Sequence, residues 1–147
     1  MPKDRTLSIP LPHFNYKVVI AFTDDFKAFA KKKKWEKFYE QIKNDGRNVS
    51  GYHCSNPEDG VAWILLRHDP KIETIVHETF HTVWRMMKFI GAEFENEVMA
   101  YHNGYIVRKI TDNLFHHDEN YKDMREFVKV KKELTNLEPE TTIEDVR

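Results

Sequence analysis

The sequence predicts an α+β domain in which a short sheet of about three strands packs on a helix, followed by two longer helices and a C-terminal helix. Short runs of β-branched and aromatic residues fill the first part of the chain, and apolar residues at helical spacing fill the middle. The composition is globular, with 40% hydrophobic and 32% charged residues. The length of 147 residues fits one domain. We expect it to span residues 1–134, before a flexible acidic tail at 135–147.

The first predicted elements are a strand at 16–22 and a helix at 24–44. Residues 16–22 read YKVVIAF, and the TDD run at 23–25 ends the strand and supplies a helix N-cap. Apolar residues then recur at three-to-four spacing, but the four lysines at 31–34 break the phase, so we expect a kink there. The residues before the strand, MPKDRTLSIPLP, are interpreted as a Pro-rich leader.

A hairpin and two helices follow. Strands at 50–55 and 61–68 flank the turn NPEDG, whose glycine can take a positive φ. A wide apolar stripe from 70 to 90 predicts a long buried helix, and 95–112 predicts a second helix that folds back on it. The amphipathic, lysine-rich stretch at 121–134 predicts the C-terminal helix.

Charge and composition argue against several function classes. The formal net charge of -1 argues against dominant binding of nucleic acid or an anionic membrane, and we interpret the lysine run as a solvated helix face. No apolar run approaches the roughly 20 residues that span a bilayer. One cysteine and no signal peptide predict a cytoplasmic protein. His53, Cys54 and His68 lack the C-x-x-C pattern of a structural zinc site, so we assign them no metal.

The motif HETFH, from His77 to His81, lies in the middle of the long predicted helix. Residues four apart share a helix face, so both imidazoles can reach one cation. Glu78 beside them can accept a proton from metal-bound water, which is typical of zinc hydrolases. A shared metal also explains two imidazoles on a buried face, which would be costly to leave unpaired. The longer metzincin pattern is absent because Trp84 and Met87 replace its Gly and third His.

A catalytic zinc needs a third protein ligand and an open position for water. On the next predicted helix, Glu97 shares a face with Ala100 and Gly104, whose small size would let this helix approach its partner closely. We therefore expect Glu97 to be the third ligand. His102, on the opposite flank of the helix, is its main rival.

Residues 96–101, NEVMAY, follow HETFH by one helix and resemble the N-E-x-x-A element of small gluzincins, zinc metallopeptidases whose ligands are two His and a Glu. The chain looks most like the compact minimal zincins of phage and bacterial genomes, in which a short sheet precedes two zinc-binding helices. The resemblance covers about 72–110 by motif. It implies a small zincin-like fold, one Zn²⁺ per chain on His77, His81 and Glu97, and Glu78 as the general base.

The resemblance also suggests supporting roles. Thermolysin-like relatives place an Asp four residues after the Glu ligand to orient a histidine, and Tyr101 stands at that position here. Its phenol oxygen is expected to accept the second N–H of a zinc-bound His. Tyr101, Tyr105 and His102 are also candidate donors to the oxyanion. In zincins an edge strand aligns an extended peptide by main-chain bonds, and the segment 61–68 would supply it.

The leading hypothesis is a zinc-dependent peptidase that acts on a peptide or protein substrate. Zinc would lower the pKa of its water toward about 7, Glu78 would take the proton, and the hydroxide would attack a carbonyl. One alternative is a non-catalytic metal-binding interaction or regulatory module whose site is closed by a fourth ligand such as His102. Another is a protease of DNA-associated proteins that is tethered by the lysine run.

Overall fold

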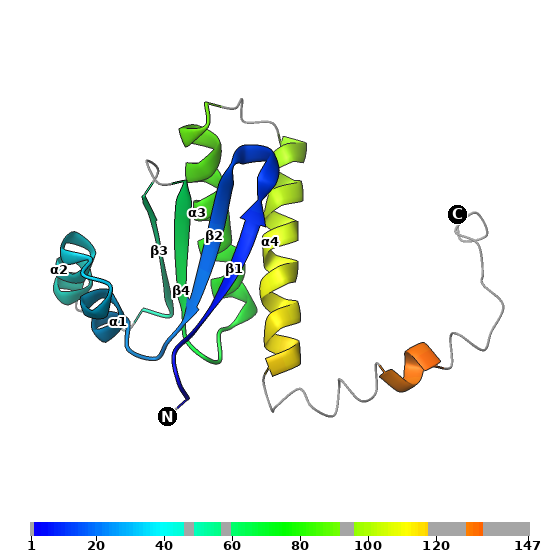
Figure 1. The fold of residues 1–147 in the computed structure, drawn as a ribbon, viewed down its shortest axis with the longest axis horizontal. Coiled ribbons are helices and arrows are strands. Elements are labelled where there is room, and N and C mark those ends of the chain that lie inside the picture. The colour runs from blue at the N-terminus through cyan, green and yellow to red at the C-terminus, as the bar shows by residue number, and fades with distance from the viewer. Residues whose placement is uncertain (1, 46–48, 57–59, 92–95, 118–128, 134–147) are drawn as a thin grey trace. The chain divides into compact units, whose positions relative to one another are not determined.

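The computed structural model describes residues 2–45, 49–56, 60–91, 96–117 and 129–133 (Figure 1). The contacts divide the chain into two compact units, Met1–Ile110 and Thr111–Arg147, and each is described by itself. The predicted domain at 1–134 extends across this boundary. No helix in the described ranges is long and apolar enough to pass through a bilayer.

The first unit contains a four-stranded mixed sheet in the order β1-β2-β4-β3, which confirms the α+β class. Its strands are β1 (Arg5–Leu11), β2 (Tyr16–Phe22), β3 (Gly51–Asn56) and β4 (Val61–Leu66). β2 and β4 are parallel, and the other two pairs are antiparallel. β3 is therefore a sheet edge and β4 is interior. The expectation that 61–68 forms the substrate edge is wrong, because both sides of β4 are already paired.

The supposed leader forms β1, so the prediction of about three strands missed one. Ile9 and Leu11 are buried at alternating positions, as in a strand with one covered face. Pro10 between them lacks the N–H that an interior strand would need. It is tolerated here because β1 lies at the edge of the sheet and, among the described strands, pairs with β2 alone.

One face of the sheet is covered by α1 (Phe26–Lys32) and α2 (Glu36–Asp45). The Asp25 carboxylate accepts a hydrogen bond from the Ala28 N–H at 3.0 Å, which confirms the predicted N-cap. The expected kink is a complete break, because Lys34 takes a φ of 61°, which no helix continues through. Buried residues from both helices and from β2 and β4 form this core, namely Ala21, Phe26, Phe29, Ala30, Ile42 and Leu65.

The other face of β3 and β4 is packed against α3 (Ile72–Phe89) (Figure 1). The hairpin of β3 and β4 and the bounds of α3 agree with the predictions. α3 is buried only on its sheet side, where its buried residues include Ile75, Thr79, Val83, Met86 and Met87. The predicted burial of this helix holds for that side alone, because its other side exposes Ile72, Val76, Phe80 and Trp84.

The next helix, α4 (Asn96–His117), begins in the first unit and is longer than predicted. Its buried residues there are His102, Ile106 and Ile110. The His102 ring contacts Phe14 of the short helix η1 (Pro12–Phe14), with ring centroids 4.7 Å apart. The opposite side of α4 is exposed, including Glu97.

The predicted packing face of α4 is therefore wrong. Ala100 and Gly104 lie on the exposed side, and a Cβ added to Gly104 would meet no atom within 4 Å. The larger aliphatic residues of the other flank determine how α4 packs, because they bury more apolar area.

The second unit has few described residues. Residues 111–117 complete α4, and 129–133 are helical, within the helix predicted at 121–134. The rest of that predicted helix and the predicted tail at 135–147 lie outside the described residues.

Candidate metal and catalytic site

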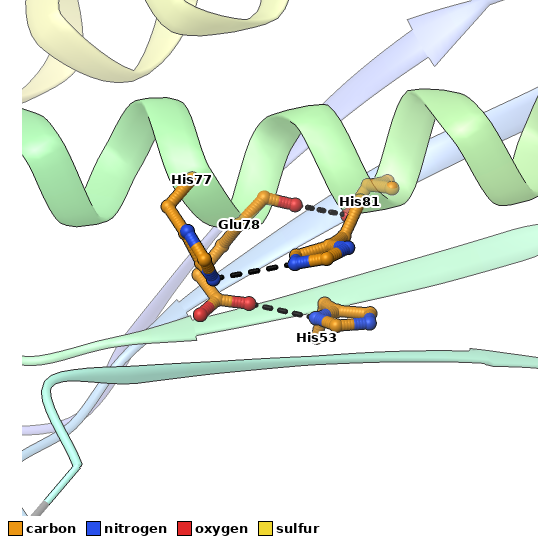
Figure 2. A network of polar contacts seen from close by, with 5 residues as sticks. His53, His77, Glu78 and His81 are labelled. Atoms are coloured by element: carbon orange, nitrogen blue, oxygen red, sulfur yellow. Dashed lines mark hydrogen bonds and ion pairs between the residues drawn. The ribbon is translucent and has the colours of Figure 1, made fainter.

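His77 and His81 converge on one point beside α3. Their Nε2 atoms are 3.2 Å apart, and their ring centroids are 4.7 Å apart with the ring planes 76° from parallel. Figure 2 shows the two rings extending from α3 toward β3. The i, i+4 spacing of the helix produces this arrangement, as the motif predicts.

The separation of the two Nε2 atoms fits a shared zinc ion. Zn–N bonds of about 2.05 Å at a tetrahedral angle place two nitrogen ligands about 3.3 Å apart. The observed 3.2 Å is close to that value. Without a metal, the same distance is satisfied by one neutral ring donating to the other. In both readings at least one of the two rings offers the lone pair of its Nε2 atom.

The environment of His81 favours the neutral ring. Burial lowers the pKa of His81 below its usual value, and the nearby His53 and His77 lower it further. The carboxylate of Glu78 opposes this effect. A neutral imidazole is the form that binds a metal, so these neighbours favour ligation over protonation.

Glu78 lies on the sheet side of α3, where it is only 7% exposed. A glycine in β3 makes room for it. A Cβ built on Gly51 would stand 3.3 Å from Glu78 Cγ and 2.9 Å from Thr74 Cγ2. Only a residue without a side chain allows α3 to approach β3 this closely, and that approach brings the Glu78 carboxylate to the strand.

The Glu78 carboxylate contacts His53 of β3, which was not among the predicted site residues. His53 Nδ1 lies 2.7 Å from Glu78 Oε2. The His53 ring also stacks on the His81 ring, with centroids 4.7 Å apart and planes 14° from parallel (Figure 2). Strand alternation could have indicated which face His53 occupies, but the sequence does not show that α3 covers that face.

These residues line a cleft between α2, β3 and α3. It has a volume of about 580 Å³ and includes His53, His77, Glu78 and Arg85 in its walls. A second cleft of about 710 Å³, on the α1–α2 side of the sheet, is lined by none of the predicted site residues. His77 and Glu78 of the predicted site, together with His53, therefore line the first cleft.

The predicted residues of α4 lie elsewhere. Tyr101 is 69% exposed and lines a small pocket with Phe14, His102 and Tyr105, which has no residue in common with the cleft of Glu78. His102 is buried, and its Nδ1 is 2.8 Å from the Val98 carbonyl oxygen. Glu97 is exposed in the first turn of α4.

A complete metal shell is not assembled within the described ranges, where no three His, Cys, Asp or Glu side chains are grouped to hold an ion. The structure brings together His77, His81 and Glu78 and adds His53. It does not bring Glu97 or Tyr101 to them. Their roles as third ligand and as supporting residue stay predictions.

Cys54 follows His53 but faces the α1–α2 core, because successive strand residues point to opposite faces. Burial raises the pKa of the Cys54 thiol to about 12, and the charge of Arg85 opposes this only in part. The thiol is protonated at neutral pH and is a poor nucleophile and metal ligand.

Comparison with known proteins found no matching family model, no matching curated protein and no matching solved structure.

Proposed function

We propose that this chain is a zinc-dependent peptidase with a small zincin-like fold. The observation that carries the proposal is the 3.2 Å approach of His77 Nε2 and His81 Nε2. It has the spacing of two ligands of one tetrahedral ion, and the buried Glu78 carboxylate lies in the same cleft.

In this proposal His77, His81 and Glu97 hold one Zn²⁺. Zinc supplies Lewis acidity, which polarises a substrate carbonyl and lowers the pKa of a water to about 7. Glu97 is proposed from the resemblance of NEVMAY to the gluzincin element. It requires the first turn of α4 to reach the two imidazoles, and residues 92–95, which precede that turn, lie outside the described part of the chain.

Glu78 is the proposed general base. An ionised carboxylate has two acceptor oxygens, and the contact with His53 uses Oε2. Oε1 is then available to take a proton from the attacking water and to pass it to the leaving amine.

The substrate is proposed to lie along β3. An edge strand presents unpaired main-chain N–H and C=O groups, and an extended peptide can pair with them. β3 is such an edge, and five of its residues, those at 51–55, line the cleft that contains Glu78. A peptide added to this edge would pass the base within the same cleft.

Metal analysis and a cleavage assay test the two halves of the proposal. Purified wild-type protein is expected to contain about one zinc per chain by mass spectrometry, and His77→Ala is expected to lose it. Wild type should cleave members of a diverse peptide pool. Glu78→Gln should keep the zinc and lose the cleavage, while Glu73→Gln, an exposed change in the first turn of α3, should keep both.

Two results would contradict the proposal. Wild type without zinc, or His77→Ala with undiminished zinc, would remove the metal. Full cleavage by Glu78→Gln would remove Glu78 as the base. Zinc binding without cleavage of any peptide would instead favour the alternative of a non-catalytic metal-binding module.

A further inference from the structure

We propose that His53 is a positioning residue that holds the Glu78 carboxylate in the orientation required for proton transfer. This inference rests on the proposed function, because it assigns a partner to the base of that reaction. Within the described residues, His53 is the side chain from the sheet that hydrogen-bonds the carboxylate.

The direction of the hydrogen bond follows from the groups involved. An ionised carboxylate only accepts, so the 2.7 Å contact requires a hydrogen on His53 Nδ1. A hydrogen bond to a charged acceptor at this length belongs to the stronger class found in proteins. His53 therefore has its Nδ1–H form, and Nε2 carries the lone pair when the ring is neutral.

His53 is itself held in place. It belongs to β3, where it lies opposite Ile64 of β4, and its ring rests flat against the His81 ring. Glu78, in contrast, has three rotatable side-chain bonds. The contact thus ties the base of α3 to the sheet. A base that is already oriented loses less freedom when the reaction begins, which is how positioning residues raise kcat.

The geometry assigns His53 to Glu78 and not to the metal. Lone pairs of imidazole nitrogens lie in the ring plane, and the His53 and His81 planes are only 14° from parallel at a centroid separation of 4.7 Å. In-plane lone pairs of two stacked rings do not converge on one ion. The Nδ1 of His53 is also already used by Glu78.

The hydrogen bond can be tested in the metal-free protein by ¹⁵N NMR of the histidine side chains. At about pH 8.5, where an ordinary imidazole is neutral, His53 is expected to show the Nδ1–H tautomer. In Glu78→Ala it should lose this preference. An Nε2–H tautomer in wild type, or an unchanged tautomer in Glu78→Ala, would overturn the inference without any measurement of activity.

Two variants test the consequence for catalysis. His53→Phe keeps a flat ring against His81 but has no donor, and His53→Asn can return an N–H donor near the position of Nδ1. We expect His53→Phe to lower kcat by about 10-fold to 100-fold, the range seen when groups that orient site residues are removed. KM should stay within about 2-fold and zinc content should be unchanged, and His53→Asn should recover most of kcat.

The outcomes separate this inference from the proposed function. An active wild type together with an unimpaired His53→Phe, or a His53→Asn no better than His53→Phe, overturns the positioning role and leaves the peptidase intact. Loss of zinc in His53→Phe overturns it in favour of a ligand role. A wild type that cleaves no peptide overturns the proposed function, and the positioning role with it.

Discussion

The sequence predicts metal ligands on both α3 and α4, but the structure brings together only the predicted site residues of α3. In α3, His77, His81 and Glu78 lie on the side that faces β3, and His77 and Glu78 line one cleft there. In α4, the face with Glu97 and Tyr101 is exposed. The opposite flank, which was not the predicted packing face, is buried.

The difference reflects what each prediction depends on. The relation of His77 to His81 is fixed by the rise of a single helix, so the sequence spacing is sufficient. The position of Glu97 depends on how a separate helix docks after a connection, and docking is decided by the summed burial of many side chains. The small residues on one face of α4 were therefore a weaker predictor of its packing than the aliphatic residues on the other face.

The largest expected effect is on zinc affinity. If three ligands share a binding free energy of about 10–16 kcal/mol, the loss of one costs about 4 kcal/mol, or on the order of 1,000-fold. His81→Ala should show this loss in a competition titration with a chelator. Glu97→Gln should show a loss of similar size if the first turn of α4 supplies the third ligand, and Glu73→Gln should show none.

A different result would contradict the role of Glu97, namely that Glu97→Gln binds zinc as tightly as wild type while His81→Ala does not. The two imidazoles would then keep their role, and Glu97 would be removed from the site. The exposed face of α4 would have no part in metal binding.

The next effect concerns the stability of α4. Ile106 is fully buried, so Ile106→Ala should lower the free energy of unfolding by about 2–5 kcal/mol through lost burial and a cavity. Tyr101 is 69% exposed, and Tyr101→Ala should change it by no more than about 0.5 kcal/mol. Urea denaturation followed by circular dichroism measures both.

The opposite order of these two variants would show that the Glu97 face of α4 is the packed one. Such a result would support the packing predicted from Ala100 and Gly104. Zinc should be removed before these measurements, because a bound metal adds its own stabilisation to the folded state.

The fold could be predicted where the signal is local. The strand at 16–22, the hairpin and the long helix at 72–89 were found because periodicity, a turn with Gly60 and a Pro before the helix all lie within a few residues of each element. β1 was missed because its prolines suggested a leader, whereas an edge strand tolerates proline. Its identity depends on pairing with β2, which no pattern within β1 reveals.

The same distinction explains the site. HETFH is a local motif and was found. His53 was not, because its contact with Glu78 joins residues 25 positions apart and requires β3 to be the strand beneath α3. Nothing in the residues around His53 distinguishes it from an ordinary strand histidine. Contacts of this kind depend on sheet order, and the sequence did not show that β3 is the edge.

A third prediction tests the close approach of α3 and β3. Gly51→Ala should lower the free energy of unfolding by about 1–3 kcal/mol, because its Cβ would stand 2.9 Å from Thr74 Cγ2 and 3.1 Å from the Leu65 carbonyl oxygen. It should also lower kcat, since α3 must move and carry Glu78 with it. Gly104→Ala, with open space around its Cβ, is the matched control.

Gly104→Ala is expected to leave the free energy of unfolding unchanged or to raise it by up to about 1 kcal/mol, because alanine is the better helix former by about that amount. A Gly51→Ala protein that is as stable and as active as wild type would show that α3 and β3 can separate without harm. The placement of Glu78 would then not depend on the glycine.

The smallest expected effect comes from Cys54, whose side chain packs on the α1–α2 side of β3. Burial raises the pKa of its thiol from about 9.0 to about 12, so above pH 9 the unfolded chain loses this proton before the folded chain does. Ionisation then favours unfolding, and stability is lost as pH rises toward 12. Between pH 9 and 10 the free energy of unfolding of wild type should fall by at most about 1 kcal/mol more than that of Cys54→Ala. Urea denaturation of both proteins at the two pH values measures this difference.

Equal losses in the two proteins would mean that the thiol ionises as readily in the folded chain as in water. The face of β3 that carries Cys54 would then be open to solvent.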